Sequence, residues 1–262
     1  MLRGDARIIV VMPAFNAART LEACVADIPQ GWADEIILVD DASQDETVQL
    51  ARGLGLTVFC HHTNRGYGGN QKTCYREALA HGADIVVMVH PDHQYDPRII
   101  PQLVEPLLAD RADAVFGSRI LGGKTREGGM PRWKLVSNVA LTHLENALLG
   151  IRLTEFHSGF RAYSRRYLEA VRFTENSDDF VFDSEIIAQG VVAGMRMHEI
   201  PIATRYFPEA SQIGFRRSVV YGLGILRMLA RYELHVRRLG RRGQFRPVEN
   251  TPAASLGDRP AE

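Results

Sequence analysis

The chain has 262 residues, of which 45% are hydrophobic and 24% charged, as in a soluble protein with one large domain or a domain with an extension. Its 31 basic and 31 acidic residues cancel, so the net charge argues neither for nor against nucleic acid as a partner. The cysteines Cys24, Cys60 and Cys74 are odd in number and lack CxxC spacing, which favours a reducing, cytoplasmic compartment over a disulfide framework. The first apolar run is too short for a signal peptide, and no run approaches the roughly 20 residues that span a bilayer.

Short apolar runs alternate with segments of helical periodicity in the first half of the chain. We expect strands at Ile8–Met12, Glu35–Val39, Leu56–Cys60, Ile85–Val89 and Ala114–Gly117. Helices are expected at Thr20–Ile28, Thr47–Leu54, Gln71–His81 and Pro97–Leu108, and a glycine-rich loop at Asn64–Asn70. This alternation predicts an α/β fold with a mostly parallel, Rossmann-like sheet and helices on both faces.

The common phosphate-binding motifs do not fit this chain. The place for GxGxxG, after the first strand, holds Pro13-Ala14-Phe15-Asn16, and the later glycines at 66, 68 and 69 are followed by Gln71 where the pattern needs glycine. Gly123-Lys124-Thr125 nearly spells a Walker A loop, but its leading glycine would fall at Ser118. Nicotinamide-binding and P-loop functions are therefore disfavoured.

Carboxylates follow two of the expected strands. Asp40 and Asp41 come after the second, where a carboxylate can accept hydrogen bonds from a base or a ribose, although Asp45 nearby fits helix capping better. After the fourth strand, His90, Asp92 and Gln94 alternate, so in an extended segment their side chains leave the same face and could hold a divalent cation. A polar turn explains the same residues equally well.

Six segments in order resemble the family 2 glycosyltransferases with the GT-A fold, especially the dolichol-phosphate or polyprenol-phosphate mannosyltransferase-like branch. The segments are VVMPAFNA, EIILVDDASQDET, NRGYGGNQK, VVMVHPDHQYDPRIIPQL, GSRILGG and HSGFRAYSR, and the resemblance extends from about Ile8 to Phe215. It implies transfer of a sugar from a nucleotide diphosphate with inversion of the anomeric centre. The expected nucleotide-binding residues are Pro13, Asn16, Asp40, Asp41, Gly69 and Lys72.

The family's metal motif, Asp-x-Asp-x-Gln, reads His90-Pro91-Asp92-His93-Gln94 here, so His90 replaces an aspartate. The resemblance implies Mn²⁺ or Mg²⁺ held by His90, Asp92 and Gln94. Imidazole suits manganese better than magnesium, which prefers oxygen ligands. His90 could instead contact phosphate or take no part.

The resemblance also implies cationic contacts to phosphate groups. Arg119 matches an arginine that meets either the diphosphate or the acceptor phosphate, and Arg205 matches an arginine in a mobile loop that closes on the diphosphate. We expect both to take part in catalysis with Asp92. Lys134 and Ser137 match an acceptor-phosphate element in which Trp133 replaces the usual arginine.

The acceptor decides whether a base is needed. A lipid phosphate has a second pKa of about 6 and is already ionised at neutral pH, whereas a sugar hydroxyl needs a general base. Asp183 occupies the place of an acidic residue near the acceptor and is our candidate site residue, although a charge in the first turn of a helix explains it too.

The C-terminal part is strongly basic, with ten arginines and two glutamates between residues 205 and 246. We divide the chain into a catalytic domain (1–212), a basic amphipathic helical extension (213–246) and a disordered tail (247–262). Apolar residues at helical spacing over Val219–Leu234 fit two interpretations, a helix packed on the domain or peripheral contact with a cytoplasmic membrane face through residues 213–242. No aromatic platform accompanies the charge, so we expect no nucleic-acid partner.

The sequence thus predicts a metal-dependent hexosyltransferase that uses a nucleotide sugar and a polyprenyl phosphate. Two alternatives remain, a hydroxyl acceptor on a glycan or small molecule and a non-catalytic nucleotide-sugar-binding protein. The sequence does not indicate the base or the sugar of the donor.

Overall fold

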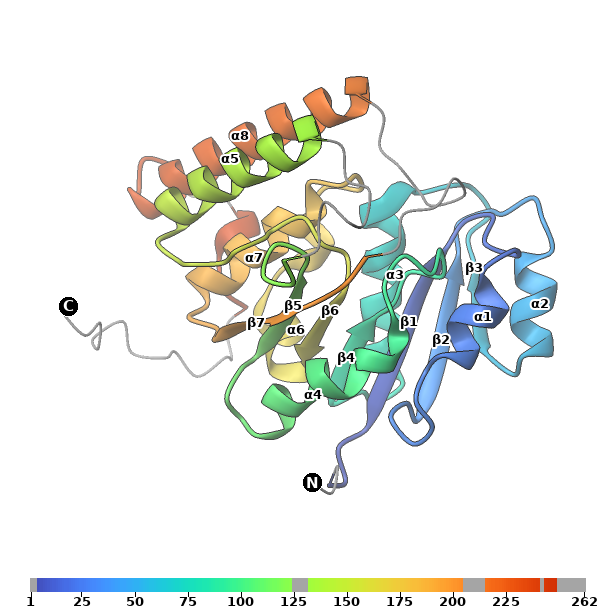
Figure 1. Cartoon of the computed structure of the whole chain (residues 1–262). Coiled ribbons are helices and arrows are strands. Elements are labelled where there is room, and N and C mark those ends of the chain that lie inside the picture. The colour runs from blue at the N-terminus through green and yellow to red at the C-terminus, as the bar shows by residue number, and fades with distance from the viewer. Residues whose placement is uncertain (1–3, 124–131, 205–214, 241–242, 249–262) are drawn as a thin grey trace.

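A seven-stranded sheet with the strand order β3-β2-β1-β4-β6-β5-β7 runs through the centre of the computed structural model (Figure 1). The structure describes residues 4–123, 132–204, 215–240 and 243–248. The strands are β1 (Ile8–Ala14), β2 (Glu35–Asp40), β3 (Thr57–Cys60), β4 (Ile85–Met88), β5 (Ala114–Ser118), β6 (Arg161–Ser164) and β7 (Met197–Pro201).

The sheet is mostly parallel, as predicted, and β6 is the exception. β6 pairs antiparallel with β4 on one side and with β5 on the other, while the remaining pairs are parallel. It therefore joins two parallel groups of strands, β3-β2-β1-β4 and β5-β7. The sequence analysis identified neither β6 nor β7, because both are short and carry polar residues such as Arg161 and Glu199.

Helices cover both faces of the sheet, also as predicted. They are α1 (Leu21–Ala26), α2 (Thr47–Gly53), α3 (Gly66–Ala80), α4 (Ile100–Leu108), α5 (Arg132–Leu149), α6 (Arg165–Ala170), α7 (Phe182–Val192) and α8 (Phe215–Val236), with 3-10 turns at Pro97–Ile99, Phe173–Glu175 and Gly243–Phe245. Alternate side chains of β1 point to opposite faces. Ile8 and Val10 join a core with α1, α2 and α4, whereas Ile9 and Val11 join a core with α3, α6, α7 and α8.

The expected loop at Asn64–Asn70 is wrong, because α3 already begins at Gly66. The N–H groups of Gly68 and Gly69 donate to the carbonyl oxygen of Asp178 at 2.8 and 3.2 Å, so the first turn of α3 lies directly against residues 177–178. A Cβ on Gly68 would come within 2.4 Å of the Ser177 carbonyl oxygen. The glycines thus permit close packing of a helix end, and they do not mark a flexible loop.

Helices α5 and α8 lie side by side at the top of Figure 1 and pack against each other. On its inner side α8 buries Ile225, Met228 and Leu229 in the same core as α7. None of the helices in the described ranges is long and apolar enough to cross a membrane. Packing on the domain is therefore confirmed for the inner side of α8, whereas the domain division itself stays a prediction. Residues 249–262 of the expected tail lie outside the described residues.

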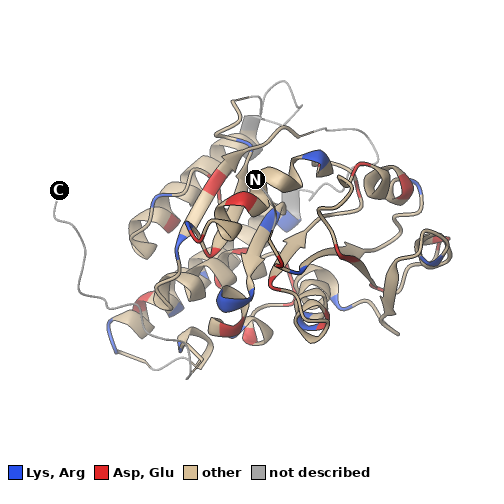
Figure 2. Cartoon of the chain, turned by 90° about the horizontal axis from the view of Figure 1, so that it is seen from below, with Lys and Arg blue, Asp and Glu red and all other residues tan. Residues whose placement is uncertain are grey.

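Basic and acidic residues are interspersed over the described chain, as Figure 2 shows from below. The exclusion of nucleic acid stays a prediction.

The close approach at Gly68 yields a stability test. We expect Gly68→Ala to lower the free energy of unfolding by about 1–3 kcal/mol, because its Cβ would also lie 2.8 Å from the Cβ of Phe182. Gly53→Ala at the end of α2 is the matched control, since its Cβ meets no atom within 4 Å. Urea unfolding should show no loss for the control, and equal effects of the two substitutions would contradict the packing argument.

Candidate active site

A cleft of about 1120 Å³ opens at the carboxyl ends of β1, β2 and β4. The loops after parallel strands meet at one edge of a sheet, which is where open α/β folds bind ligands. Helices α5 and α8 supply part of the wall through Trp133, Ser137, Arg217 and Tyr221. The predicted site residues that line the cleft are Pro13, Asn16, Asp41, His90, Asp92, Gln94, Arg119, Ser137 and Asp183.

Among the described residues, the predicted site residues Asp40, Gly69 and Lys72 do not line the cleft. The Nζ of Lys72 donates to the carbonyl oxygen of Asn176 and, at 2.7 Å, to Asp178 Oδ1. The backbone N–H of Gly69 is bound to Asp178 as described above. Arg205 lies outside the described residues, as does the side chain of Lys134 on α5. The predicted roles of these residues therefore stay predictions.

The carboxylate of Asp41 is engaged in holding the start of α3. Its oxygens accept from the backbone N–H groups of Arg65 at 2.8 Å and Gly66 at 3.0 Å, and Oδ1 lies 2.7 Å from His61 Nδ1. A carboxylate at a helix N-terminus is favourable because it satisfies free N–H groups there. Asp41 thus fixes the position of α3 beside the cleft and leaves less of its hydrogen-bonding capacity for a nucleotide.

Asn16 and Asp40 link the loops that follow β1 and β2. Asn16 Oδ1 accepts from the N–H of Gln44 at 2.8 Å, and the N–H of Asn16 donates to Ser43 Oγ at 2.8 Å. Asp40 Oδ2 accepts from the N–H of Ser43 at 3.0 Å, while its buried Oδ1 has no hydrogen-bond partner among the described residues. This edge of the cleft is therefore shaped before any ligand binds.

The expected extended segment at His90–Gln94 is wrong, because the chain turns there. The N–H of His93 donates to the His90 carbonyl oxygen at 3.4 Å, and His93 has a φ of 57°. The segment forms a turn, and the metal-binding role of its residues stays a prediction. His90, Asp92 and Gln94 all still line the cleft, but not through strand alternation.

The environment of Asp92 differs from that of His90. Burial raises the pKa of Asp92 to about 6, and one of its oxygens accepts from the N–H of Gln94 at 3.1 Å. Burial, with the charge of Arg161, lowers the pKa of His90 to about 4, so this imidazole is neutral at pH 7. The His90 ring stacks on Tyr67 with 5.5 Å between centroids, and a Cβ on Gly159 would lie 2.6 Å from Nε2. Within the described ranges, no group of three or more His, Cys, Asp and Glu residues could hold a metal ion.

Arg119 lines the cleft but is held by a buried acid. Its Nε donates to Glu155 Oε1 and its backbone N–H to Glu155 Oε2, each at 2.7 Å, and Nη2 also donates to Glu155 and to the carbonyl oxygen of His157. Glu155 was not among the predicted site residues. This pairing fixes the guanidinium of Arg119 at the wall of the cleft.

Below the cleft, Arg161 of β6 holds Asp183 at the start of α7. Arg161 is 1% exposed and donates to the carbonyl oxygens of Phe156 and Ser158, each at 2.7 Å, and of Asp183 at 3.2 Å. Its Nη2 lies 3.3 Å from Asp183 Oδ2. A charge this deeply buried requires such partners. Arg161 was missed, although it stands in the quoted segment HSGFRAYSR.

Asp183 receives two further donors. Tyr67 Oη donates to Oδ2 at 2.9 Å and Gln71 Nε2 to Oδ1 at 3.2 Å. Burial raises the pKa of Asp183, while Arg161, Tyr67 and Gln71 oppose that rise. Both carboxylate oxygens are thus occupied by groups of the protein, and Tyr67, which the sequence analysis also missed, connects Asp183 with His90.

Comparisons with known proteins agree with this geometry. Residues 9–172 match the family described as Glycosyl transferase family 2. The chain belongs to this family. The family 2 assignment confirms the resemblance stated above and makes the protein a glycosyltransferase.

Two similar proteins carry dolichyl phosphate in their names. A UDP-N-acetylglucosamine–dolichyl-phosphate N-acetylglucosaminyltransferase of Methanococcus voltae is 28% identical over 248 residues, which cover 86% of this chain and 98% of that protein. A dolichyl-phosphate hexose transferase of Haloferax volcanii is 30% identical over 199 residues, covering 75% of this chain and 82% of the relative.

Solved structures agree on the fold. Glucosyl-3-phosphoglycerate synthase from Mycobacterium tuberculosis, in complex with phosphoglyceric acid, has a TM-score of 0.69 at 22% identity and covers 88% of this chain and 81% of that one. Its complex with Mn²⁺, UDP and phosphoglyceric acid has a TM-score of 0.67 at 23% identity, covering 88% and 79%. This likeness confirms the predicted GT-A fold.

The pair of Arg161 and Asp183 can be tested by stability. We expect Asp183→Asn to lower the free energy of unfolding by about 3–5 kcal/mol, because it leaves the buried Arg161 guanidinium without its counter-charge. Asp178→Asn is the control, since Asp178 also pairs with a cation, Lys72, but its side chain is 69% exposed. The control should cost about 0–1 kcal/mol in urea unfolding, and a loss for Asp183→Asn in that same range would refute the buried pairing.

Proposed function

We propose that this protein transfers a hexose, with inversion, from a nucleotide diphosphate sugar to a polyprenyl phosphate. The observation that carries the proposal is that α5 and α8 form both a wall of the polar cleft and an exposed apolar face. An acceptor with a charged head and a hydrocarbon chain needs a polar cleft that lies beside an apolar surface. The names of the two relatives that act on dolichyl phosphate support the same acceptor class.

The donor fits the opposite end of the cleft. Pro13, Asn16 and Asp41 come from the loops after β1 and β2, and Asp92 and Gln94 from the loop after β4. These loops offer carboxylate and amide groups that can bind a base and a ribose. The volume suits a nucleotide sugar together with the head of an acceptor. The donor's base is not specified by these residues, so GDP-mannose and UDP-glucose types both remain candidates.

A divalent cation, Mn²⁺ or Mg²⁺, is part of the proposal. Burial has already raised the pKa of the Asp92 carboxyl, so its ionised form would gain from a neighbouring cation. Asp92 and Gln94 supply oxygen donors that suit either ion. A bound cation would stabilise the charge that develops on the departing diphosphate. His90 fits this role less well, because its ring packs between Tyr67 and Gly159.

The occupied state of Asp183 favours a phosphate over a hydroxyl acceptor. A hydroxyl must lose its proton to a base within reach, but Asp183 already accepts from Tyr67, Gln71 and Arg161. An ionised phosphate needs only positive charge and hydrogen-bond donors to hold it. Arg119 and Arg217 face the cleft and can provide these.

The direct test is sugar transfer to undecaprenyl phosphate in vesicles, with UDP-glucose, UDP-N-acetylglucosamine or GDP-mannose and Mn²⁺. We expect a lipid-linked sugar with one of these donors, loss of activity with EDTA, and recovery with added metal. Asp92→Asn should lower kcat/KM about 100-fold or more. Asp96→Asn is the control in the same loop, because Asp96 pairs with Arg98 away from the cleft. Equal activity of the two variants would rule out the assigned role of Asp92.

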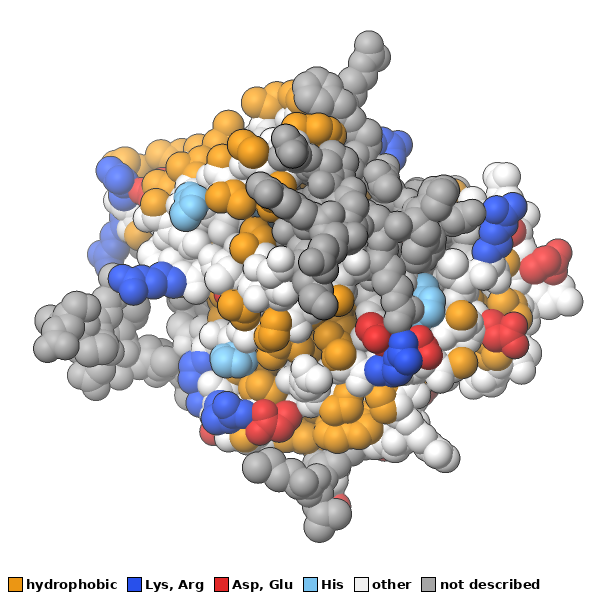
Figure 3. Space-filling model, in the orientation of Figure 1, with side chains coloured by type: hydrophobic (Ala, Val, Ile, Leu, Met, Phe, Trp, Pro, Cys, Tyr) orange, Lys and Arg blue, Asp and Glu red, His pale blue; other side chains and the backbone are white. Residues whose placement is uncertain are grey.

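Peripheral membrane contact is also part of the proposal. The exposed apolar face comprises Trp133, Val136 and Leu144 of α5 with Val219, Val220, Leu223, Leu226, Leu234 and Val236 of α8. It forms the orange area over these helices in the upper left of Figure 3. Arg217 and Arg227 are exposed on α8 as well, and so is Arg237 directly after its end. An apolar face with flanking arginines fits an anionic bilayer surface.

Leu223→Glu tests this contact. Leu223 is 60% exposed, so we expect little change in stability but about 10-fold weaker co-sedimentation with vesicles that contain anionic lipid. Gln49→Glu adds the same charge to the exposed side of α2, at the far edge of the sheet, and should bind vesicles as the unchanged protein does. If both variants bind equally well, the face does not contact lipid.

A further inference from the structure

Three polar side chains from separate elements meet beneath the cleft, and the proposed mechanism leaves them without a role. His157 Nδ1 lies 2.7 Å from the hydroxyl oxygen of Tyr221 on α8. On the other side of the ring, Nε2 lies 3.4 Å from Oε2 of Glu145 on α5. Glu145 is fully buried, and the side chain of Ser184 on α7 also lies beside its carboxyl. We call Glu145, His157 and Tyr221 the relay.

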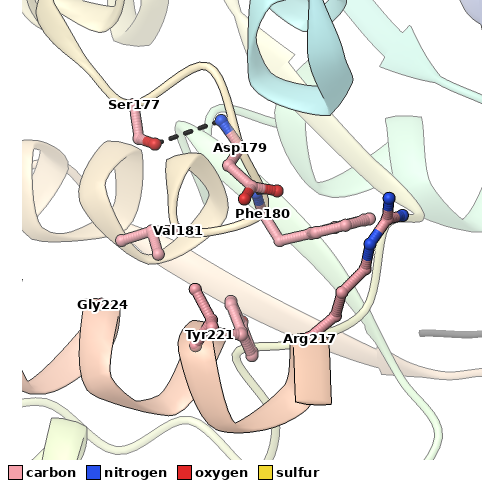
Figure 4. Close-up of a pocket in the computed structure, with 8 residues that line it drawn as sticks. Ser177, Asp179, Phe180, Val181, Arg217, Tyr221 and Gly224 are labelled. Atoms are coloured by element: carbon pink, nitrogen blue, oxygen red, sulfur yellow. Dashed lines mark hydrogen bonds between the residues drawn. The ribbon is translucent and has the colours of Figure 1, made fainter. Parts of the chain in front are cut away.

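The outer end of the relay reaches the place where an acceptor would bind. Tyr221 lines the large cleft and also a side pocket of about 310 Å³ with Phe180, Val181, Val220 and Gly224. Figure 4 shows Tyr221 and Arg217 rising from α8 toward Phe180. Tyr221 therefore borders both the polar cleft and a mostly apolar pocket.

Burial keeps the members of the relay neutral near pH 7. Burial raises the pKa of Glu145 to about 8, opposed by the neighbouring Ser184 and by the charge of Arg161. Burial, followed by the charges of Arg119 and Arg161, lowers the pKa of His157 to about 3. Burial, followed by the charges of Glu145 and Asp183, raises the pKa of Tyr221 well above its ordinary value, with Arg161 and Ser184 opposing.

The neutral relay has two proton arrangements. In the first, the Glu145 carboxyl donates to Nε2 and Nδ1–H donates to the Tyr221 oxygen, so the Tyr221 O–H points away from His157 and can donate to a ligand in the cleft. In the second, Nε2–H donates to Glu145 and the Tyr221 O–H donates to Nδ1, so the cleft meets only a lone pair of the tyrosine oxygen. An ionised Glu145 has no proton to give, and it permits only the second arrangement.

We propose that Tyr221 donates a hydrogen bond to the anionic head of the acceptor, and that Glu145 and His157 are positioning residues that direct its O–H into the cleft. This inference rests on the proposed function, because it takes the acceptor to be a phosphate attached to a hydrocarbon chain. The hydrocarbon chain would begin in the side pocket beside Tyr221.

The pH dependence follows from Glu145. Its carboxyl is protonated below a pKa of about 8, so the outward arrangement is available there and is lost as the pH rises through that value. A phosphate monoester has its second pKa at about 6, so its own charge changes little above pH 7. Binding of a phosphate acceptor should therefore weaken between pH 7 and 9.5, and the cause is the ionisation of Glu145 and not a change in the charge of the phosphate.

The test measures the affinity of the full-length protein for farnesyl phosphate by titration calorimetry, with farnesol as the uncharged probe. At pH 7, Tyr221→Phe should weaken farnesyl phosphate binding about 10-fold and leave farnesol binding unchanged, because it removes one hydrogen bond to a charged group. Tyr232→Phe is the matched control on α8, since Tyr232 is buried against Phe245 and does not line the cleft.

Glu145→Gln tests whether Glu145 directs the Tyr221 O–H or only supports the fold. The glutamine amide can donate to Nε2 at any pH. At pH 7 the affinity of Glu145→Gln for farnesyl phosphate should therefore stay within about 3-fold of that of the unchanged protein. The dissociation constant of the unchanged protein should rise at least about 5-fold between pH 7 and 9.5, and that of Glu145→Gln should not.

Several outcomes would overturn the proposal: unchanged affinity in Tyr221→Phe, the same rise with pH in Glu145→Gln, or no binding of farnesyl phosphate by the unchanged protein. The transfer assay is judged separately. If the relay variants behave as expected but no sugar is transferred, the proposed function fails and the relay stands. If sugar is transferred while Tyr221→Phe keeps its acceptor KM, the relay fails alone.

Discussion

The buried guanidinium of Arg161 is the group on which the site depends. It lies on β6, the antiparallel strand between the two parallel groups of the sheet, and it binds the carbonyl oxygens of Phe156 and Ser158. By pairing with Asp183 it also fixes the start of α7. A cation without solvent must be surrounded by acceptors, so the loop before β6 and the first turn of α7 have little freedom to move independently. Those two segments form the floor of the cleft.

The carboxylates around the cleft fall into two groups, those that hold other parts of the protein and Asp92. Asp41 holds the start of α3, Glu155 holds Arg119, and Asp183 accepts from Arg161, Tyr67 and Gln71. Asp92 is different, because it is largely desolvated and only the N–H of Gln94 is seen to donate to it within the described ranges. The structural acids thus form a rigid frame, and Asp92 is left as the acid most in need of a cation from a ligand.

The sequence predicted the first half of the fold well because each strand there is a continuous apolar run buried on both faces, as in Ile85–Met88. It failed at β6, where a buried arginine reads as a surface residue, and at the start of α3, where glycines read as a loop. Both features depend on partners distant in sequence, Asp183 and Asp178. For the same reason the residue types of the cleft were predictable, whereas the engagement of Arg119 by Glu155 and of Asp183 by Tyr67 was not.

In the proposed complex, the cleft framed by Arg161 receives the nucleoside diphosphate between the loops after β1, β2 and β4. Hydrogen–deuterium exchange with UDP or GDP and Mn²⁺ can locate the bound nucleotide. We expect slower exchange in peptides that cover residues 13–17, 41–44 and 91–95, and no change in residues 109–113 at the opposite edge of the sheet. Slower exchange at residues 109–113, with the three loops unaffected, would contradict it.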